Sequence, residues 1–271
     1  MLPVEILDYI FSYLLDVDSL EATMKAHPLF SRIAERHLYA NIALHNYYKK
    51  FVPECHNWQL PLEVGQLLNL LSERPHTANY VLDLTIDIGE DDDKLFPFLE
   101  AIPSILPLLL KLRSLRLLRL SSLWTLFEEF PNLPENLLLS LAKSIQMPSM
   151  KCVDIYGVAI PLSLFHQCCN TVEWLVLNLC TISEPDHSAS EVESSSSDCP
   201  PLKDLWIIEV DPSLETLVPY IADRCRQLRH FRFAPFYVEP LDLIKPIFES
   251  CSNTLTVLNI DMDEFCKVNS T

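Results

Sequence analysis

The chain has 271 residues, is 49% hydrophobic and carries a formal net charge of −17, so it can hold one large domain or a small domain followed by a larger one. The negative charge argues against nucleic acid and anionic membranes as partners. The only three glycines, Gly65, Gly89 and Gly157, lie far apart, which excludes a phosphate-cradling loop or a dinucleotide-binding fingerprint, and we expect no cofactor.

The stretch from Val4 to Asp16 is mainly apolar and is interrupted by Glu5, Asp8 and Ser12. We expect neither a signal peptide, because no basic region precedes it, nor a membrane span, because it is too short. Apolar residues at helical spacing form two stripes, one with Ile6, Ile10 and Tyr13 or Leu14, the other with Leu7, Phe11 and Leu14 or Leu15. A helix that is apolar on two sides must be buried on two sides.

Two more short helices are expected to follow. Asp18 or Ser19 can cap the first of them, and Pro28 starts the second, which should run to about Ala43. Three short helices within residues 1–43 make only a marginal core. We therefore expect this helical unit to lean on the rest of the chain, on another protein, or on both.

Three segments between residues 2 and 42 carry a family resemblance: Leu2-Pro3-x-Glu5-Ile6-Leu7-x-x-Ile10-Phe11-Ser12-Tyr13-Leu14, Asp18-x-Leu20 and Ala34-Glu35-Arg36-His37-Leu38-Tyr39. The first two resemble the opening of the F-box and the start of its second helix. The third is similar to the A-R-R-H-L-F ending common in fungal F-box proteins.

This resemblance implies a unit that docks on a Skp-type adaptor and, through the adaptor, on a cullin in a ubiquitin ligase. It implies that the adaptor-binding residues are Leu2, Pro3, Ile6, Leu7, Ile10 and Leu14. The alternative is a three-helix cap that merely closes the domain behind it.

Residues 44–79 are expected to be a connector, with a helix from Pro61 to Ser72. From residue 80 to residue 271 a frame of apolar-x-x-apolar-x-apolar recurs seven times. Its copies are Val81/Leu84/Ile86, Leu112/Leu115/Leu117, Met150/Val153/Ile155, Val172/Leu175/Leu177, Leu202/Leu205/Ile207, Leu228/Phe231/Phe233 and Leu255/Leu258/Ile260.

Helix-like stretches fall between the frames, as at Glu135 to Gln146, Pro161 to Cys169, Leu214 to Cys225 and Leu241 to Cys251. Short alternating strands and helices predict an α/β fold in which a parallel sheet lines a curved solenoid. The frame resembles a degenerate leucine-rich repeat, whose usual Asn or Cys after the frame is matched only by Cys180. A doubly wound α/β fold would give the same alternation, but it has no reason to repeat one frame.

The segment from Ser183 to Pro201 is rich in serine and acidic residues and low in bulky ones. It is too poor in apolar side chains to order itself, so we expect a disordered loop. Its serines beside acidic residues could be phosphorylated, although an inert loop insertion is the simpler interpretation.

Between the buried frame positions, alternate residues should point to the open, concave side of the sheet. One column across the repeats is Asp83, Ser114, Cys152, Trp174, Asp204, His230 and Val257; the next is Thr85, Arg116, Asp154, Val176, Trp206, Arg232 and Asn259. Trp and Arg dominate binding hot spots. We therefore predict a client-binding site formed by Trp174, Trp206, Arg232, Arg116 and Tyr156, unless the acidic loop or packing covers the tryptophans.

No catalytic motif or clustered set of metal ligands appears in the sequence. Cys168 and Cys169 beside His166 could be a nucleophile with its base, but we interpret both cysteines as closing an amphipathic helix. Asp91 to Asp93 is interpreted as a solvated loop. The nine cysteines contain no C-x-x-C pair, which is typical of reduced thiols in an intracellular protein of the cytoplasm or nucleus.

By resemblance, the chain is expected to be a non-catalytic substrate receptor of a Skp–cullin–F-box ubiquitin ligase, with the repeat region holding an unidentified protein client. A second hypothesis is a scaffold whose F-box-like cap binds no ligase. A third is an enzyme with an unrecognised site on the α/β body.

Overall fold

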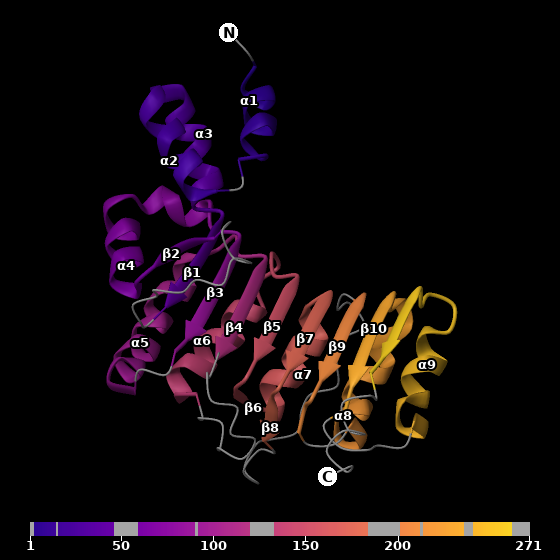
Figure 1. Cartoon of the computed structure of the whole chain (residues 1–271). Coiled ribbons are helices and arrows are strands. Elements are labelled where there is room, and N and C mark those ends of the chain that lie inside the picture. Colours follow the sequence, from indigo (N-terminus) through magenta and orange to yellow (C-terminus); the bar gives the residue numbers. More distant parts are fainter. Residues whose placement is uncertain are drawn as a thin grey trace, which may run out of the picture. The chain divides into compact units, whose positions relative to one another are not determined.

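A computed structural model describes residues 3–14, 16–45, 59–89, 92–119, 133–183, 201–211, 214–235 and 241–261 of the chain (Figure 1). The chain divides into two compact units, Met1–Arg116 and Leu117–Thr271. The protein is α/β, with a large parallel sheet, as the alternation of frames and helix-like stretches predicts. The boundaries predicted at residues 43 and 79 stay predictions.

The first unit opens with three helices, α1 (Val4–Phe11), α2 (Val17–Ala26) and α3 (Pro28–Leu38). The cap of α2 is Asp16, not Asp18 or Ser19, because its carboxylate accepts the Ser19 N–H at 2.7 Å. The third helix ends at Leu38 and does not reach Ala43. Residues from Asn41 onward form a strand instead, because they alternate between buried and half-buried positions.

The three helices pack around a small core to which the rest of the first unit contributes. Its buried members are Leu7, Phe11, Leu20, Ile33, Ala34, Leu38 and Leu60, the last from strand β2 (Leu60–Leu62). The Asp8 carboxylate of α1 accepts hydrogen bonds from Arg36 at 2.9 Å and pairs with His37 at 3.0 Å, which ties α1 to α3. The three helices thus pack against a later segment of the chain, as expected for a core of marginal size.

In the first unit, β1 (Asn41–His45) pairs in parallel with both β2 and β3 (Asp83–Ile88). The helices here are α4 (Val64–Glu73), η2 (Pro75–Asn79), α5 (Asp92–Ile105) and η3 (Leu106–Leu108). The helix expected from Pro61 is confirmed as α4, which starts later, at a Glu63–Gln66 capping box. Asp92 and Asp93 open α5 and do not form a loop, whereas Asp91 lies outside the described residues.

Strand β4 (Ser114–Arg119) runs through the boundary between the units. In the second unit β5 (Cys152–Tyr156), β7 (Trp174–Asn178), β9 (Asp204–Ile208), β10 (His230–Ala234) and β11 (Val257–Ile260) follow one another in the sheet and pair in parallel. Together with β3 and β4, these strands contain the second and third apolar positions of all seven frames, and the first position lies two residues before each strand. The prediction of strands at the frames is therefore confirmed.

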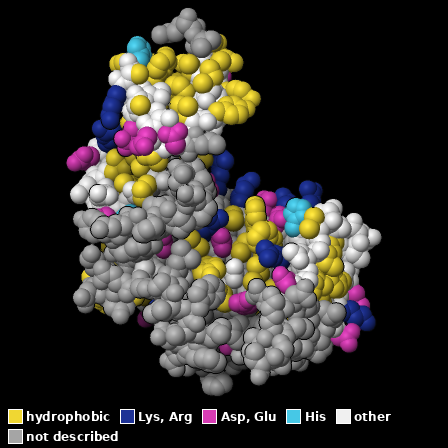
Figure 2. Space-filling view, in the orientation of Figure 1, with side chains coloured by type: hydrophobic (Ala, Val, Ile, Leu, Met, Phe, Trp, Pro, Cys, Tyr) yellow, Lys and Arg dark blue, Asp and Glu magenta, His cyan; other side chains and the backbone are white. Residues whose placement is uncertain are grey.

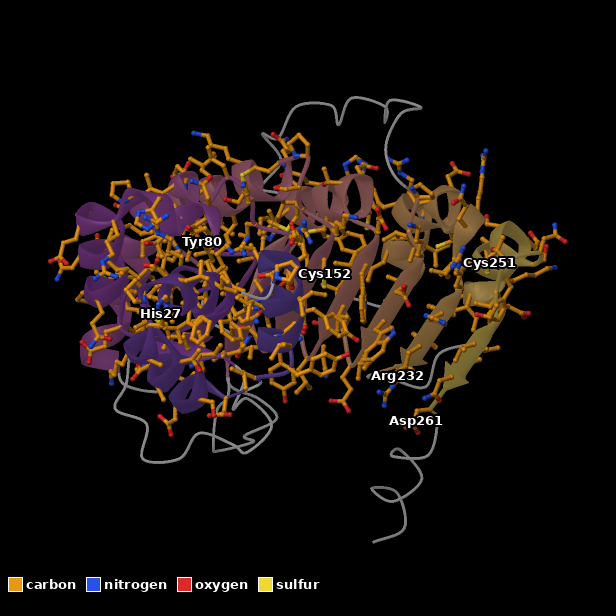
Figure 3. All side chains as sticks on the ribbon, turned by 90° about the horizontal axis from the view of Figure 1, so that it is seen from above. His27, Tyr80, Cys152, Arg232, Cys251 and Asp261 are labelled. Atoms are coloured by element: carbon orange, nitrogen blue, oxygen red, sulfur yellow. The ribbon has the colours of Figure 1, made fainter. Side chains whose placement is uncertain are left out.

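Helices of the second unit connect successive strands and gather on one side of the sheet (Figures 1 and 3). They are α6 (Glu135–Ile145), α7 (Leu162–Thr171), α8 (Leu214–Ile221), η4 (Ala222–Gln227), η5 (Leu241–Ile244) and α9 (Lys245–Cys251). The frame residues that face these helices, such as Leu175, Leu205 and Phe231, are buried. The frame of β11 is the exception, with Leu258 48% exposed and Leu255 and Ile260 half-buried, because no strand beyond β11 covers it among the described residues.

The same turn follows three successive strands of the second unit. Gly157, Leu179 and Glu209 have φ angles of 70°, 52° and 50°, and each donates its N–H to the last residue of the next strand. Two of these turns lead into short strands, β6 (Ala159–Pro161) and β8 (Thr181–Ser183), which pair in parallel. A left-handed residue at equivalent places is evidence of a structural repeat, because such backbone angles are rare outside glycine.

Among the described residues, no helix has both the length and the apolar character required to cross a bilayer. The predicted loop lies outside the described part of the chain between residues 184 and 200.

Candidate functional site

Helix α1 presents an uncovered apolar surface, which we call the α1 face. It consists of Ile6, Tyr9 and Ile10 of the helix and Tyr13 just after it, and both tyrosines are more than 60% exposed. Hydrophobic side chains are prominent over these N-terminal helices in the space-filling view (Figure 2). Such a cluster on one short helix is typical of a surface that another protein covers.

The tyrosines of the α1 face interact with one another. Their hydroxyl groups are 2.6 Å apart and their rings meet edge to face, with centroids separated by 5.1 Å. This hydrogen bond raises the pKa of Tyr13 above its usual value. One hydroxyl donates to the other, so a partner that covers the rings needs to accept only the one remaining O–H.

The structure divides the predicted adaptor contacts. Ile6 and Ile10 lie on the α1 face, Pro3 is exposed at the start of α1, and Leu14 is half-buried against the helical core. Leu7, in contrast, is a core residue, because its stripe packs against the other helices, and we remove it from the candidate surface. Leu2 lies outside the described residues.

Sequence reasoning did not select Tyr9 and Tyr13 as contacts. Tyr13 belongs to the apolar stripe of Ile6 and Ile10, and Tyr9 lies beside that stripe on the helix. Helical spacing could have indicated them, but only packing decides which stripe stays uncovered.

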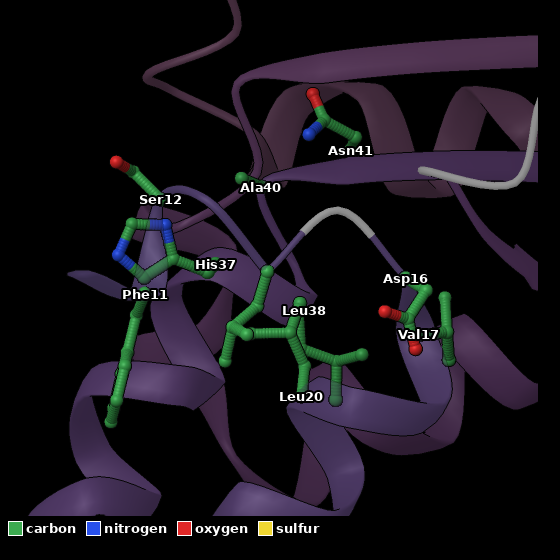
Figure 4. Close-up of a pocket in the computed structure, with 10 residues that line it drawn as sticks. Phe11, Ser12, Asp16, Val17, Leu20, His37, Leu38, Ala40 and Asn41 are labelled. Carbon is green, nitrogen blue, oxygen red and sulfur yellow. The ribbon is translucent and has the colours of Figure 1, made fainter. Parts of the chain in front are cut away.

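A small pocket of about 170 Å³ lies at the base of the three helices (Figure 4). It is lined mainly by Phe11, Leu14, Leu20, Leu38 and Asn41, with His37 at its edge. Sites for organic ligands usually enclose roughly 300 to 1,000 Å³, so this pocket is small for such a ligand. We interpret it as imperfect packing between the helices and the start of β1.

The second candidate surface is the side of the second unit's sheet that faces away from the helices, which we call the open face. The strand register aligns Cys152, Trp174, Asp204, His230 and Val257 in one row, and Asp154, Val176, Trp206, Arg232 and Asn259 in the next. For β5 to β11, the predicted columns are therefore confirmed.

The first unit departs from the predicted columns. Thr85 is buried on β3, because the Gln59 amide covers it and donates to its hydroxyl at 2.8 Å. Asp83 is half-buried, and burial raises the pKa of its carboxyl group, while Arg113 and Arg116 oppose this shift. These positions do not form the open polar column that the frame predicts.

Trp174, Trp206 and Arg232 come together on the open face, and we call them the Trp–Arg cluster. The two indole rings have centroids 6.3 Å apart on neighbouring strands. The Arg232 guanidinium carbon lies 5.6 Å from the centre of the Trp206 ring, a cation–π arrangement. Arg232 is on the side of the strands away from the helices (Figure 3), and Trp174 is 43% exposed.

The two other predicted client contacts are placed differently. Tyr156 ends β5, two strands from Trp206, and burial raises the pKa of its hydroxyl, with Glu209 adding to the shift. Arg116 is half-buried on β4 and belongs to the first unit. The structure therefore unites three of the five predicted residues in one cluster.

Ion pairs surround the Trp–Arg cluster where the strands begin. Glu173 and Lys203 pair at 2.6 Å, and this hydrogen bond lowers the pKa of the Glu173 carboxyl group. Asp204 pairs with the His230 imidazole on the adjacent strand. Both acids thus have a partner within the chain, Lys203 for Glu173 and the His230 ring for Asp204.

The paired cysteines of α7 are core residues. Cys168 and Cys169 are fully buried, and burial raises the pKa of Cys168 to about 12 and that of Cys169 well above its usual value. Burial lowers the pKa of His166, with Arg224 adding to the shift. A thiol held protonated at neutral pH is a poor nucleophile, which agrees with the interpretation of both as packing residues.

In the described ranges, no group of three or more His, Cys, Asp or Glu side chains is placed to hold a metal ion. No protein-family model matches the sequence, and no curated protein matches it. The candidate sites therefore rest on their geometry alone: an apolar helix face in one unit and an aromatic, charged strand face in the other.

Proposed function

We propose that this protein is the substrate-recognition subunit of a Skp–cullin–F-box ubiquitin ligase. In this proposal the α1 face docks on a Skp-type adaptor, and the open face of the second unit binds a protein client. The chain itself makes and breaks no bond. It raises the effective concentration of the client at the subunit that transfers ubiquitin.

The α1 face is the observation that carries the proposal. Helix α1 has two apolar stripes, but only the stripe of Leu7 and Phe11 is packed in the core. Burial of apolar surface contributes about 25 cal/mol per Å², so a partner that covers the other stripe gains substantial binding energy. The segments that resemble the F-box include this same helix, which supports a Skp-type adaptor as the proposed partner.

The architecture of the second unit supports a recognition role for it. Parallel strands in register present alternate side chains on one surface, as repeat proteins do when they bind other proteins. Cys180 occupies the place where leucine-rich repeats carry Asn or Cys, and its buried thiol donates to the carbonyl oxygens of Ile155 at 3.1 Å and Asn178 at 3.2 Å.

Copurification of the full chain with a Skp-type adaptor tests the proposal. The parent chain should form a stable complex, and the double substitution Ile6→Asp with Ile10→Asp should lose it, because two carboxylates would enter an apolar interface unpaired. Leu110→Asp is the matched control, since Leu110 is an exposed leucine of the same unit outside the α1 face.

The proposal predicts that the control binds like the parent and that both variants unfold in urea as the parent does. A parent chain that binds no Skp-type adaptor, or a double variant that binds as well as the parent, would overturn it. The first result would leave a scaffold without a ligase as the better hypothesis.

A further inference from the structure

We propose that the Trp–Arg cluster binds an extended acidic segment of a protein, with an apolar side chain seated on Trp174 and Trp206 and a carboxylate held by Arg232. This inference rests on the proposed role of the open face in client binding. It adds the chemistry of the segment that the face selects.

The basic and acidic side chains around the cluster differ in whether they have an ion-pair partner. Among the described residues, Arg229 and Arg232 have no carboxylate within ion-pair distance. In contrast, Glu173 and Asp204 are both paired, and Asp154 and Glu209 also have partners. Arg229 and Arg232 are therefore cations of this region without an ion pair among the described residues, although the whole chain carries −17.

Arg232 is the centre of this imbalance. Its Nε is buried and has no hydrogen-bond partner in the part of the chain that the structure describes. The guanidinium carbon lies over the Trp206 ring, and the planar guanidinium group can bind a carboxylate through two parallel hydrogen bonds. A partner carboxylate would therefore bind the terminal N–H groups of Arg232, which have no carboxylate within ion-pair distance among the described residues, and not the buried Nε.

The spacing of the cluster suits an extended peptide. Trp174, Trp206 and Arg232 lie on the three consecutive strands β7, β9 and β10, so the cluster extends across two strand intervals, or about 10 Å. Alternate residues of an extended chain are about 7 Å apart and point the same way. When the carboxylate of such a peptide binds Arg232, the peptide side chain two positions further along therefore lies over the indole rings.

The net charge of the whole chain indicates which kind of acidic ligand this cluster can bind. Nucleic acids and anionic lipid surfaces present many negative charges to a large area, and a chain of net charge −17 repels them. A peptide with one or two carboxylates needs only the local positive charge. Figure 2 shows Lys, Arg and His side chains next to hydrophobic ones in the second unit, which is the mixture such a peptide requires.

Selection from a library of random dodecapeptides displayed on phage, with the full chain as the target, tests this inference. The expected result is enrichment of peptides with Asp or Glu two positions from an aromatic or aliphatic residue. The enriched peptide, made synthetically, should bind at least tenfold more weakly when its acid is replaced by the amide.

Two variants locate the binding. Arg232→Gln and Trp206→Ala should each weaken the synthetic peptide at least tenfold, whereas Lys143→Gln, an exposed lysine on α6, should not change it. Thermal unfolding identifies any variant that fails to fold. If Trp206→Ala fails to fold, Arg232→Gln alone still tests the binding.

Enrichment of basic peptides, no enrichment at all, or equal binding by Arg232→Gln would overturn the inference. Adaptor copurification is independent of these results, because Arg232 and Trp206 lie outside the unit that carries the α1 face. A chain that binds the adaptor but no acidic peptide would disprove this inference alone. A chain that binds the peptide but no adaptor would disprove only the ligase proposal.

Discussion

The α1 face and the open face both leave large aromatic side chains in contact with water, but they do so in different ways. The α1 face is apolar, and its two tyrosine hydroxyl groups form a hydrogen bond with each other. The open face interleaves its tryptophans with Arg232 and with two ion pairs. One surface is suited to a permanent apolar contact, whereas the other is suited to a ligand chosen by its charge.

The faces also differ in what decides which residues are exposed. In the second unit, the two-residue period of a strand sends Leu175 inward and Trp174 and Val176 outward. In α1, both stripes are equally apolar, and contact with α2, α3 and Leu60 selects the stripe that is buried. A strand pattern therefore predicts exposure better than an isolated helix pattern does.

The largest expected effect tests the two stripes of α1. Leu7→Ala should destabilise the first unit by about 2 to 5 kcal/mol, because it leaves a cavity in a small core. Ile6→Ala, one position away and exposed, should change stability by less than about 0.5 kcal/mol. Urea unfolding and hydrogen exchange of the α2 and α3 amides measure the stability of both variants. Equal losses of stability in the two variants would show that both stripes are packed.

A second comparison uses glycines of the two units. Gly157→Ala should cost about 1 to 3 kcal/mol, because a Cβ there would lie 2.6 Å from the Arg119 carbonyl oxygen at a φ of 70°. Leu179 and Glu209 carry side chains at similar φ angles, so the close approach of Arg119 decides the effect.

Gly65→Ala is the matched control for this substitution. Gly65 lies in the first turn of α4 with no atom within 4 Å of the added methyl group, so the change should stabilise the chain by about 0.5 to 1 kcal/mol. Urea unfolding compares the two variants. A harmless Gly157→Ala would mean that the turn after β5 can relax.

The smallest expected effect concerns the ion pairs of the open face. Glu173→Gln should lower stability by less than about 0.5 kcal/mol at pH 7, because the pair with Lys203 is partly exposed. The folded-state pKa of Glu173 is lowered, so its contribution is present above the ordinary value of 4.5 and is lost as the pH falls through the lowered value. The stabilities of the two proteins in urea unfolding should therefore converge as the pH falls below the lowered pKa of Glu173, and a difference that persists in fully acidic buffer would exclude the carboxylate as its source.

The sequence by itself determined the strands of the second unit and their outward rows. Each frame places two apolar residues at the two-residue spacing of a strand, and β5, β7, β9 and β10 follow that pattern in register. Trp174 and Trp206 could therefore be assigned to neighbouring strands before any coordinates were known. Strands β1 and β2 were missed, since Asn41 follows a helical pattern without a break and Leu60–Leu62 is too short to show a period.

Only the tertiary structure decided the exposure of Ile6 and the burial of Leu7, the covering of Thr85 by Gln59, and the position of Arg232 over Trp206. Each depends on a side chain from a segment that is distant in sequence, such as Leu60 for α1 or β10 for the indole of β9. Local periodicity carries the direction of a side chain relative to its own backbone. It carries no information about which distant group packs against that side chain, and that contact decides whether the residue belongs to the core or to a binding surface.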